Sequence, residues 1–377
     1  MTKIETDAVT CPANEQELAE AIRDTSGPLV VRGGGTRPIG RALVGAPLSV
    51  AAMTGIAMYE PGALTLVAAS GTPVSEIDAA LAAEGQRLPF EPMDHRGLLG
   101  TEGTPTIGGV VATNASGPRR VQAGACRDSL IGVRFVDGGG AIIKNGGRVM
   151  KNVTGYDLVK LFAGSWGTLG VLSEVSFKLL PSPESAATVV FDGLDPALAV
   201  ALMAAGLGSP FDVSGAARLP DGRTALRVEG FATSVAYRAG ELTRHLSRFG
   251  AANVLDTEQT KAYWQDIRDV VPFHGREGDV WRLSVKPSDA PHLIEALSVE
   301  ALMDWGGGLV WLLTEPGADL RAILSGFTGH ATLIRASAET RAQVAPFHPE
   351  AAAVAALSSG LRAKFDPRGI LNPGLME

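Results

Sequence analysis

Residues 103–120, GTPTIGGVVATNASGPRR, are the stretch on which the prediction of the fold depends. A long segment this rich in Gly, Thr, Asn and Ser indicates either a functional loop or disorder. The apolar run IGGVVA inside it predicts an ordered loop with a short helix. Its small residues, hydroxyls and the Asn114 amide are typical of a site for an extended polar ligand, with an irregular surface loop as the alternative.

A second glycine segment, Arg32-Gly33-Gly34-Gly35-Thr36, follows the apolar run at 28–31. This order predicts a strand that ends in a loop with unhindered backbone N–H groups, which suits a pyrophosphate. A plain glycine turn is the alternative. The loop is not a Walker A motif, because Arg41 and Ala42 replace its Lys and Ser/Thr, and it lacks the Rossmann spacing. A nucleotide triphosphatase and a Rossmann dehydrogenase are both disfavoured.

A third glycine segment covers residues 164–171, GSWGTLGV. Glycines here could let the backbone approach a flat ring system, and a bulged strand is the alternative. Each segment alone is a weak signal. Three of them within residues 32–171 favour a bound ligand.

The residues around these segments predict an α+β domain over 1–181. Asn14 as an N-cap, with Glu17 at the third helical position, predicts a short helix through Ile22. Thr72 is predicted to cap a helix that has Pro73 at its first position and ends at Gly85. Strands are predicted at 28–31, 64–69, 129–136, 141–144 and 174–179.

The last of these strands has Val175, Phe177 and Leu179 alternating with polar residues, the pattern of a strand with one buried face. Prolines at 181 and 183 end it and mark a domain boundary. Residues 182–344 are predicted to form a smaller α+β domain that includes a helix over 234–249. Residues 345–377 are predicted to form a helix through Phe365 followed by two turns.

Composition limits the partners and the metal chemistry. The chain has 377 residues, a net charge of −7 and only two cysteines, Cys11 and Cys126. Two cysteines cannot hold an iron–sulfur cluster or a structural zinc, so any cluster must belong to a partner. The acidic charge disfavours nucleic acid, and no apolar stretch predicts direct membrane insertion. We expect a cytoplasmic protein that only partners would bring to a membrane.

Taken in order, five segments resemble a known flavoprotein superfamily. Residues 32–36, 103–120, 151–175 and 365–374 are similar to the FAD-binding signatures of the vanillyl-alcohol-oxidase, or PCMH-type, superfamily. Residues 263–288 resemble in particular the E subunits of bacterial glycolate oxidases. The resemblance implies an FAD-binding domain of two subdomains over 1–181, an inserted cap over 182–344, and closure by the C-terminal tail 345–377.

The resemblance also implies which residues contact FAD. Residues 33–36 would form the pyrophosphate loop, the segment after Thr106 would follow the diphosphate, ribityl chain and flavin, and Gly170 and Val171 would approach the adenosine half. Asn372 would lie near the ring system. The full set expected to bind FAD is Arg32, Gly33, Gly34, Gly35, Thr36, Thr106, Ile107, Gly108, Gly109, Ala112, Thr113, Asn114, Ser116, Gly117, Gly170, Val171 and Asn372.

Two features of the superfamily are missing from the sequence. The pyrophosphate loop 32–40 has neither the His nor the Cys through which covalent members attach flavin, so noncovalent FAD is expected. The six histidines are dispersed and form no metal cluster like that of related 2-hydroxy-acid dehydrogenases. Arg268, His274, Trp281 and Arg282 are the cap residues that could meet a carboxylate, although ion pairing or core packing explains each more simply. No catalytic residue can be assigned.

The function implied by the resemblance is that of an FAD-binding subunit of a glycolate (2-hydroxy acid) oxidase. Such a subunit works with a sister FAD-binding subunit and an iron–sulfur subunit, and the complex oxidises glycolate to glyoxylate. One alternative is a stand-alone dehydrogenase for another small 2-hydroxy acid, which the missing histidine cluster disfavours. The other is a noncatalytic structural subunit that keeps the flavoprotein fold, which the intact glycine segments disfavour.

Overall fold

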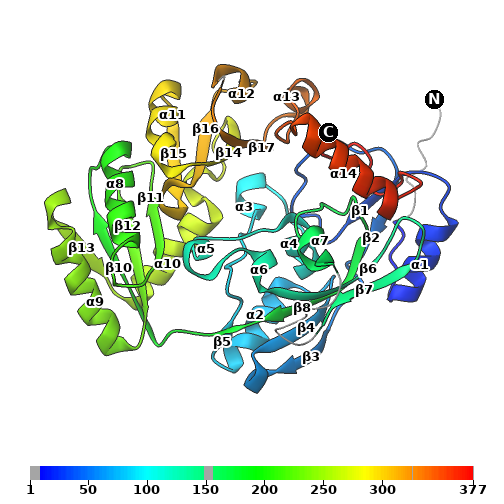
Figure 1. The fold of residues 1–377 in the computed structure, drawn as a ribbon, viewed down its shortest axis with the longest axis horizontal. Helices are drawn as coiled ribbons and strands as arrows, with labels where there is room; N and C mark the ends of the chain where they lie inside the picture. The colour runs from blue at the N-terminus through cyan, green and yellow to red at the C-terminus, as the bar shows by residue number, and fades with distance from the viewer. Residues whose placement is uncertain (1–8, 148–155, 325, 377) are drawn as a thin grey trace.

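The computed structural model describes residues 9–147, 156–324 and 326–376 (Figure 1). Its N-terminal half contains a five-stranded antiparallel sheet in the order β3-β4-β8-β6-β7. Apolar residues of three helices pack on one face of this sheet. The strands are β3 Ile56–Glu60, β4 Thr65–Ala69, β6 Leu130–Val136, β7 Ile142–Gly146 and β8 Val171–Lys178, and the helices are α2 Val74–Ala83, α4 Ile107–Thr113 and α7 Leu158–Phe162.

The prediction of a half-buried strand at 174–179 agrees with the structure at Glu174 and Lys178, which are partly exposed, and fails at Ser176, which is buried. β8 is the central strand of the sheet, and even its serines, Ser173 and Ser176, are buried. Helix α1 (Glu15–Asp24) contributes to covering the second face, because Glu15 accepts hydrogen bonds from Arg134 of β6 and from the Ser173 hydroxyl. Small hydroxyl residues can therefore be buried there with a partner, which periodicity alone does not reveal.

Helix starts agree with the sequence at α1 and differ at α2. The Asn14 side chain accepts a hydrogen bond from the backbone N–H of Glu17, as predicted. Thr72 does not cap α2, because its hydroxyl donates to the carbonyls of Ala69 and Gly55 instead. Pro73 occupies the N-cap position, and the helix begins one residue later than expected.

A short parallel pair of strands, β1 (Leu29–Arg32) and β2 (Ala46–Ser49), carries the first glycine loop. The C-terminal tail extends this pair, since Leu371 forms a parallel bridge with Leu29. The tail reaches this position after helix α14 (Ala352–Phe365), so the ends of the chain meet in one small core with α1.

The second half is an eight-stranded antiparallel sheet in the order β13-β10-β12-β11-β15-β16-β14-β17. Helices α8 (Pro196–Leu207), α9 (Ala232–His245), α11 (Ala290–Leu297) and α12 (Leu320–Ile323) pack on one face. The predicted helix at 234–249 is α9, which ends earlier and continues as a 3₁₀ turn. The strands are β10 Ser185–Phe191, β11 Val213–Arg218, β12 Thr224–Gly230, β13 Ala252–Leu255, β14 Asp279–Val285, β15 Glu300–Asp304, β16 Leu309–Thr314 and β17 Gly329–Arg335.

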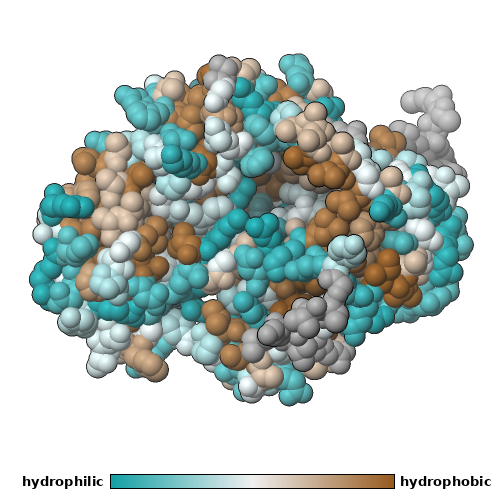
Figure 2. All heavy atoms as spheres, in the orientation of Figure 1, coloured by the Kyte–Doolittle hydropathy of each residue, from teal (hydrophilic) through white to brown (hydrophobic). Residues whose placement is uncertain are grey.

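The other face of this sheet packs on helix α10 (Thr257–Asp269) and on the N-terminal half. Ile39, Met93 and Leu98 share one apolar cluster with Trp264 of α10 and Trp311 of β16. The two halves are therefore joined by a buried core, and burial of apolar surface at this boundary stabilises their relative position. The face drawn in Figure 2 is hollowed between the halves.

Candidate functional site

A cavity of about 930 Å³ lies where the glycine segments meet. Its walls come from four stretches far apart in the sequence, 30–43, 106–113, 165–172 and 336–342, together with Val50, Ser70 and two residues of the C-terminal tail. Cavities of this size are typical of cofactor sites. The site is thus built by the fold and not by any single motif.

The first glycine loop requires glycine for two separate reasons, close packing and a positive φ. A Cβ on Gly33 would lie 2.4 Å from the Thr106 hydroxyl oxygen, and one on Gly34 would lie 1.6 Å from the Thr104 carbonyl oxygen. Gly35 has φ of +71°, which side-chain-bearing residues rarely adopt. The glycines thus allow the loop to pack against residues 104–106, as well as leaving its backbone open.

The backbone N–H groups of Gly33, Gly34, Gly35 and Thr36 make no hydrogen bond with any described residue. These residues also line the cavity. Successive unpaired N–H groups in a loop bind anionic oxygens, and a dinucleotide provides such oxygens in its diphosphate. The loop therefore fits the diphosphate of FAD.

The second glycine segment forms α4, as predicted. The Thr106 hydroxyl accepts a hydrogen bond from the N–H of Gly109 and so caps the helix. Gly108 lies against Ser70, where a Cβ would be 2.6 Å from the serine side chain. The helix can therefore approach the sheet closely while its first turn and Ala112 face the cavity.

The C-terminal tail is fastened to the cavity wall by Asn372. Its Oδ1 accepts a hydrogen bond from the N–H of Val31 at 2.7 Å, and its Nδ2 donates to the carbonyl of Trp166 at 2.9 Å. Asn372 has φ of +46° and is buried. One side chain thus links β1, the third glycine segment and the tail.

Of the seventeen residues predicted to contact FAD, thirteen line the cavity. Four do not: Ile107 is fully buried in the core, and Asn114 and Ser116 bond the backbone N–H groups of Arg127 and Cys126. Gly117 lies at the boundary, where its carbonyl accepts from the Trp305 indole. The thirteen are Arg32, Gly33, Gly34, Gly35, Thr36, Thr106, Gly108, Gly109, Ala112, Thr113, Gly170, Val171 and Asn372.

Sequence reasoning missed two groups of lining residues. Arg37, Pro38 and Ile39 continue the wall beyond the predicted loop, and the cap contributes residues after β17. Arg341 of α13 (Ala338–Gln343) ties the two together, because its guanidinium donates to the carbonyl of Pro38 at 2.6 Å. No motif marks the cap residues, since they are ordinary alanines and an arginine. The cap residues are Ala336, Ala338, Arg341 and Ala342.

Three of the cap residues singled out from the sequence have structural partners. Arg268 forms an ion pair with Asp269, and the His274 ring is hydrogen-bonded to the Asp269 carbonyl. Trp281 is fully buried in the core of the cap. Arg282 differs from these, because no described residue forms a hydrogen bond or an ion pair with it.

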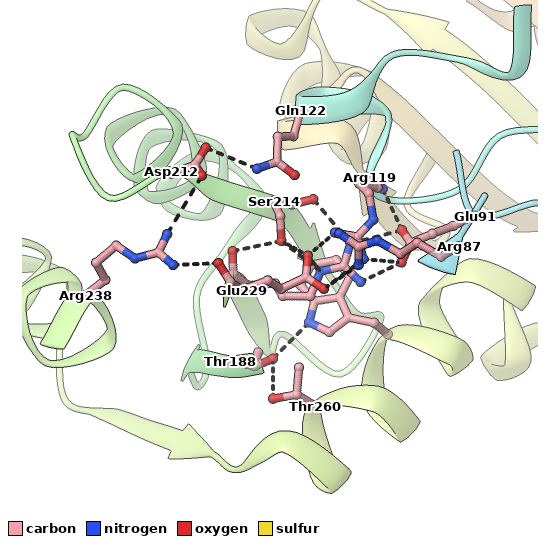
Figure 3. Close-up of polar contacts among 12 residues, drawn as sticks. Arg87, Glu91, Arg119, Gln122, Thr188, Asp212, Ser214, Glu229, Arg238 and Thr260 are labelled. Atoms are coloured by element: carbon pink, nitrogen blue, oxygen red, sulfur yellow. Dashed lines mark hydrogen bonds and ion pairs between the residues drawn. The ribbon is translucent and has the colours of Figure 1, made fainter. Parts of the chain in front are cut away.

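The halves are also joined by an ion-pair network of five residues, Arg87, Glu91, Arg119, Arg227 and Glu229 (Figure 3). Three come from the N-terminal half and two from β12 of the cap. Burial opposes ionisation of Glu91, but Arg227 and Arg119 outweigh it and lower its pKa to about 2. The same arginines hold the pKa of Glu229 below its usual range. Every carboxylate in the network is therefore charged and shared between arginines.

Within the described residues, no group of three or more His, Cys, Asp or Glu side chains is arranged to hold a metal ion. No described helix is long and apolar enough to cross a membrane.

Comparison with known proteins agrees with this geometry. Residues 6–146 match the family model described as an FAD binding domain. The chain is 36% identical to the glycolate oxidase protein GlcE of Escherichia coli, over 96% of this chain and 95% of that protein. It is 33% identical to the glycolate oxidase protein GlcD of Bacillus subtilis, over 51% of this chain and 41% of that protein.

The fold itself recurs in more distant proteins. The 4-ethylphenol oxidase of Gulosibacter chungangensis superposes with a TM-score of 0.71 and 12% sequence identity, covering 98% of this chain and 88% of that one. The family model and the similarity to GlcE, together with the fold, identify an FAD-binding oxidoreductase of the PCMH-type, or vanillyl-alcohol-oxidase, class. Within that class, the chain belongs to the GlcE family of glycolate oxidase subunits.

Proposed function

We propose that this chain is the GlcE-type FAD-binding subunit of a glycolate (2-hydroxy acid) oxidase complex that converts glycolate to glyoxylate. The similarity to GlcE of Escherichia coli over 96% of the chain is the observation that carries the proposal. Its partners are a sister FAD-binding subunit and an iron–sulfur subunit, which takes the electrons onward. These partners would also provide any association with a membrane.

The cavity supports binding of FAD through the residues predicted for it. The unpaired N–H groups of residues 33–36 would hold the diphosphate, and α4 would lie beside the ribityl chain and flavin. Bound FAD supplies the electron acceptor for removal of hydride from the carbinol carbon of the substrate. Arg341 and the alanines around it line the cavity from the cap side, and the Arg341 hydrogen bond to Pro38 joins the cap to the glycine-loop wall.

The attachment of FAD is proposed to be noncovalent. No His, Cys or Tyr occurs among the described residues that line the cavity. Cys126 is fully buried outside its wall, and burial raises the pKa of its thiol, which disfavours the nucleophilic thiolate. Extraction with acid should therefore release FAD completely, whereas flavin that stays with the precipitated protein would contradict noncovalent binding.

The domain boundaries along the chain are part of the proposal as well. Residues 1–181 form the FAD-binding domain, 182–344 the cap, and 345–377 the returning segment. Two observations support this division: the eight strands β10 to β17 all fall in the middle range, and Asn372 of the tail accepts a hydrogen bond from Val31 of β1. Separate expression of 182–344 would test whether the cap folds alone.

The proposed function is tested by the visible spectrum of the purified, FAD-loaded chain under anaerobic conditions. We expect flavin bands that bleach on addition of glycolate once the sister subunit is present. Bleaching without the sister subunit would show that this chain itself takes the hydride. A colourless chain that cannot be reconstituted with FAD, or flavin that glycolate never reduces in the assembled complex, would contradict the proposal.

A further inference from the structure

Arg282 projects from β14 at the boundary between the halves and has no polar partner among the described residues. Its guanidinium lies 5.3 Å from the centroid of the Trp305 ring and 6.0 Å from that of Trp311. Burial, and then the nearby charge of Arg120, lower the pKa of Arg282 to about 10. Arg282 is half-buried, and a cation that is partly removed from water without a carboxylate beside it favours binding of an anion.

A second arginine approaches the same tryptophan from the other half of the molecule. Arg120 lies on the short helix α5 (Arg120–Ala123), and its guanidinium is 4.4 Å from the centroid of the Trp305 ring. No described residue accepts a hydrogen bond from its side chain or forms an ion pair with it. Two positive side chains therefore converge on one indole, which supplies cation–π contact. Asp128 acts on Arg120 electrostatically but forms no ion pair with it.

His95 provides a third donor. The Nε of Arg37 donates to Nδ1 of His95 at 3.1 Å, and Nη2 of Arg37 donates to the carbonyl of Met93 at 3.1 Å. Nδ1 of His95 also lies 3.3 Å from the Met93 carbonyl, which could accept a proton from it. Because the Nε–H of the always protonated Arg37 can only donate, and at the shorter distance, we assign Nδ1 as the acceptor and place the proton of the neutral ring on Nε2. His95 is only 8% exposed, and its Nε2 has no partner among the described residues.

These groups belong to one region that adjoins the cavity. Arg37 lines the cavity itself, and Arg37 and Arg282 both lower the pKa of His95, to about 3, along with burial. The cavity residues Ile39 and Trp166 pack in the same apolar cluster as Trp305 and Trp311. We call Arg37, His95, Arg120 and Arg282 the arginine cluster.

We propose that Arg282, Arg120 and the Nε2–H of His95 bind the carboxylate of a small organic acid beside the FAD cavity. The inference rests on the proposed function, because it assigns the carboxylate end of the 2-hydroxy acid to a named site. Guanidinium groups suit this ligand, since they can offer two parallel N–H donors to one carboxylate. The apolar indole walls exclude water and strengthen the attraction.

The site can be tested without turnover by using acetate, which has the carboxylate of glycolate but no carbinol hydroxyl to oxidise. Binding to the FAD-loaded protein is measured by saturation-transfer NMR of the acetate methyl signal, at constant ionic strength. Acetamide serves as the uncharged matched ligand. We expect saturable binding of acetate and none of acetamide.

Variants assign the binding to the cluster. Arg282→Met and Arg120→Met should each raise the Kd for acetate about 10-fold or more, the loss expected for a charge-assisted hydrogen bond. Arg248→Met is the matched control, because Arg248 is an exposed cap arginine that also lies over an aromatic ring, Phe249. Its Kd should stay within about twofold of the wild type. Each variant must retain FAD, as shown by its visible spectrum.

The two possible failures are distinguishable. Absence of saturable acetate binding, or equal Kd values in the wild type and in whichever of the two variants retains FAD, would overturn the carboxylate site even if glycolate still bleaches the flavin. Acetate binding that both variants lose would support the site even if glycolate fails to reduce the assembled complex. In that second case only the proposed oxidation of glycolate would be wrong.

Discussion

Two sets of arginines lie at the boundary between the halves, and they differ in what surrounds them. In the ion-pair network, Glu91 and Glu229 are shared among Arg87, Arg119 and Arg227. In the arginine cluster, the guanidinium groups contact aromatic rings, a neutral histidine and a carbonyl, and no described carboxylate forms an ion pair with them, although Asp94 acts on Arg37 and Asp128 on Arg120 at longer range. The same residue type therefore holds the halves together in one place and leaves a positive, sheltered site in the other.

The presence or absence of a paired carboxylate therefore separates structural arginines from candidate ligand-binding arginines. A buried arginine whose charge is paired with carboxylates has few N–H donors available for a ligand, and removing its partner destabilises the fold. A sheltered arginine without an anion is kept at a cost to stability, and such costs are typical of functional sites.

The largest effect is expected from breaking the network. Glu229→Gln removes a charge on which Arg119 and Arg227 depend, and it should lower the free energy of unfolding by about 3–5 kcal/mol. Urea unfolding of the variant and the wild type measures the change. A loss below about 1 kcal/mol would mean that the network does not hold the halves together.

The next largest effect is expected for a substitution in the C-terminal tail. It weakens the cavity wall and leaves both sets of arginines unchanged. Asn372→Ala leaves the Val31 N–H and the Trp166 carbonyl unpaired and places alanine at a positive φ. We expect a loss of about 3 kcal/mol and faster release of FAD. Asn253→Ala, on exposed β13, is the control and should change neither unfolding nor FAD retention.

A smaller effect concerns pH and belongs to the arginine cluster. The pKa of His95 is lowered to about 3 by burial, Arg37 and Arg282, from its ordinary 6.5. Between these two pH values His95 is protonated in the unfolded chain and neutral in the folded one. The free energy of unfolding therefore falls as the pH drops from about 6.5 toward 3. The wild type should lose about 2 kcal/mol more than His95→Gln between pH 8 and pH 5. If the free energies of unfolding of the wild type and of His95→Gln changed in parallel with pH, the pKa of His95 would not be lowered in the folded protein.

The smallest effect is expected for an exposed ion pair outside both sets. Glu300→Gln breaks the pair with Arg276, in which both side chains are more than 40% exposed. Because solvent screens such pairs, the free energy of unfolding should change by less than about 1 kcal/mol. A loss as large as that of Glu229→Gln would remove the distinction between paired arginines in the boundary and those on the surface.

The sequence predicted the cavity wall better than it predicted the boundary. Residues 33–36 and α4 are local signals, because glycines and caps act within a few positions. Nothing local shows that Arg282 lacks a partner while Arg227 has two, since Glu91, one of the two partners of Arg227, lies 136 positions away in the sequence. The same holds for Ser173, whose burial in β8 depends on Glu15 of a distant helix.

The most direct test is a crystal structure of the FAD-loaded protein soaked with acetate under conditions free of other carboxylates. We expect FAD with its diphosphate at residues 33–36, and acetate within hydrogen-bonding distance of Arg282 and of Nε2 of His95. FAD in place with acetate bound only elsewhere, or with Arg282 paired to a carboxylate of the chain itself, would contradict this expectation.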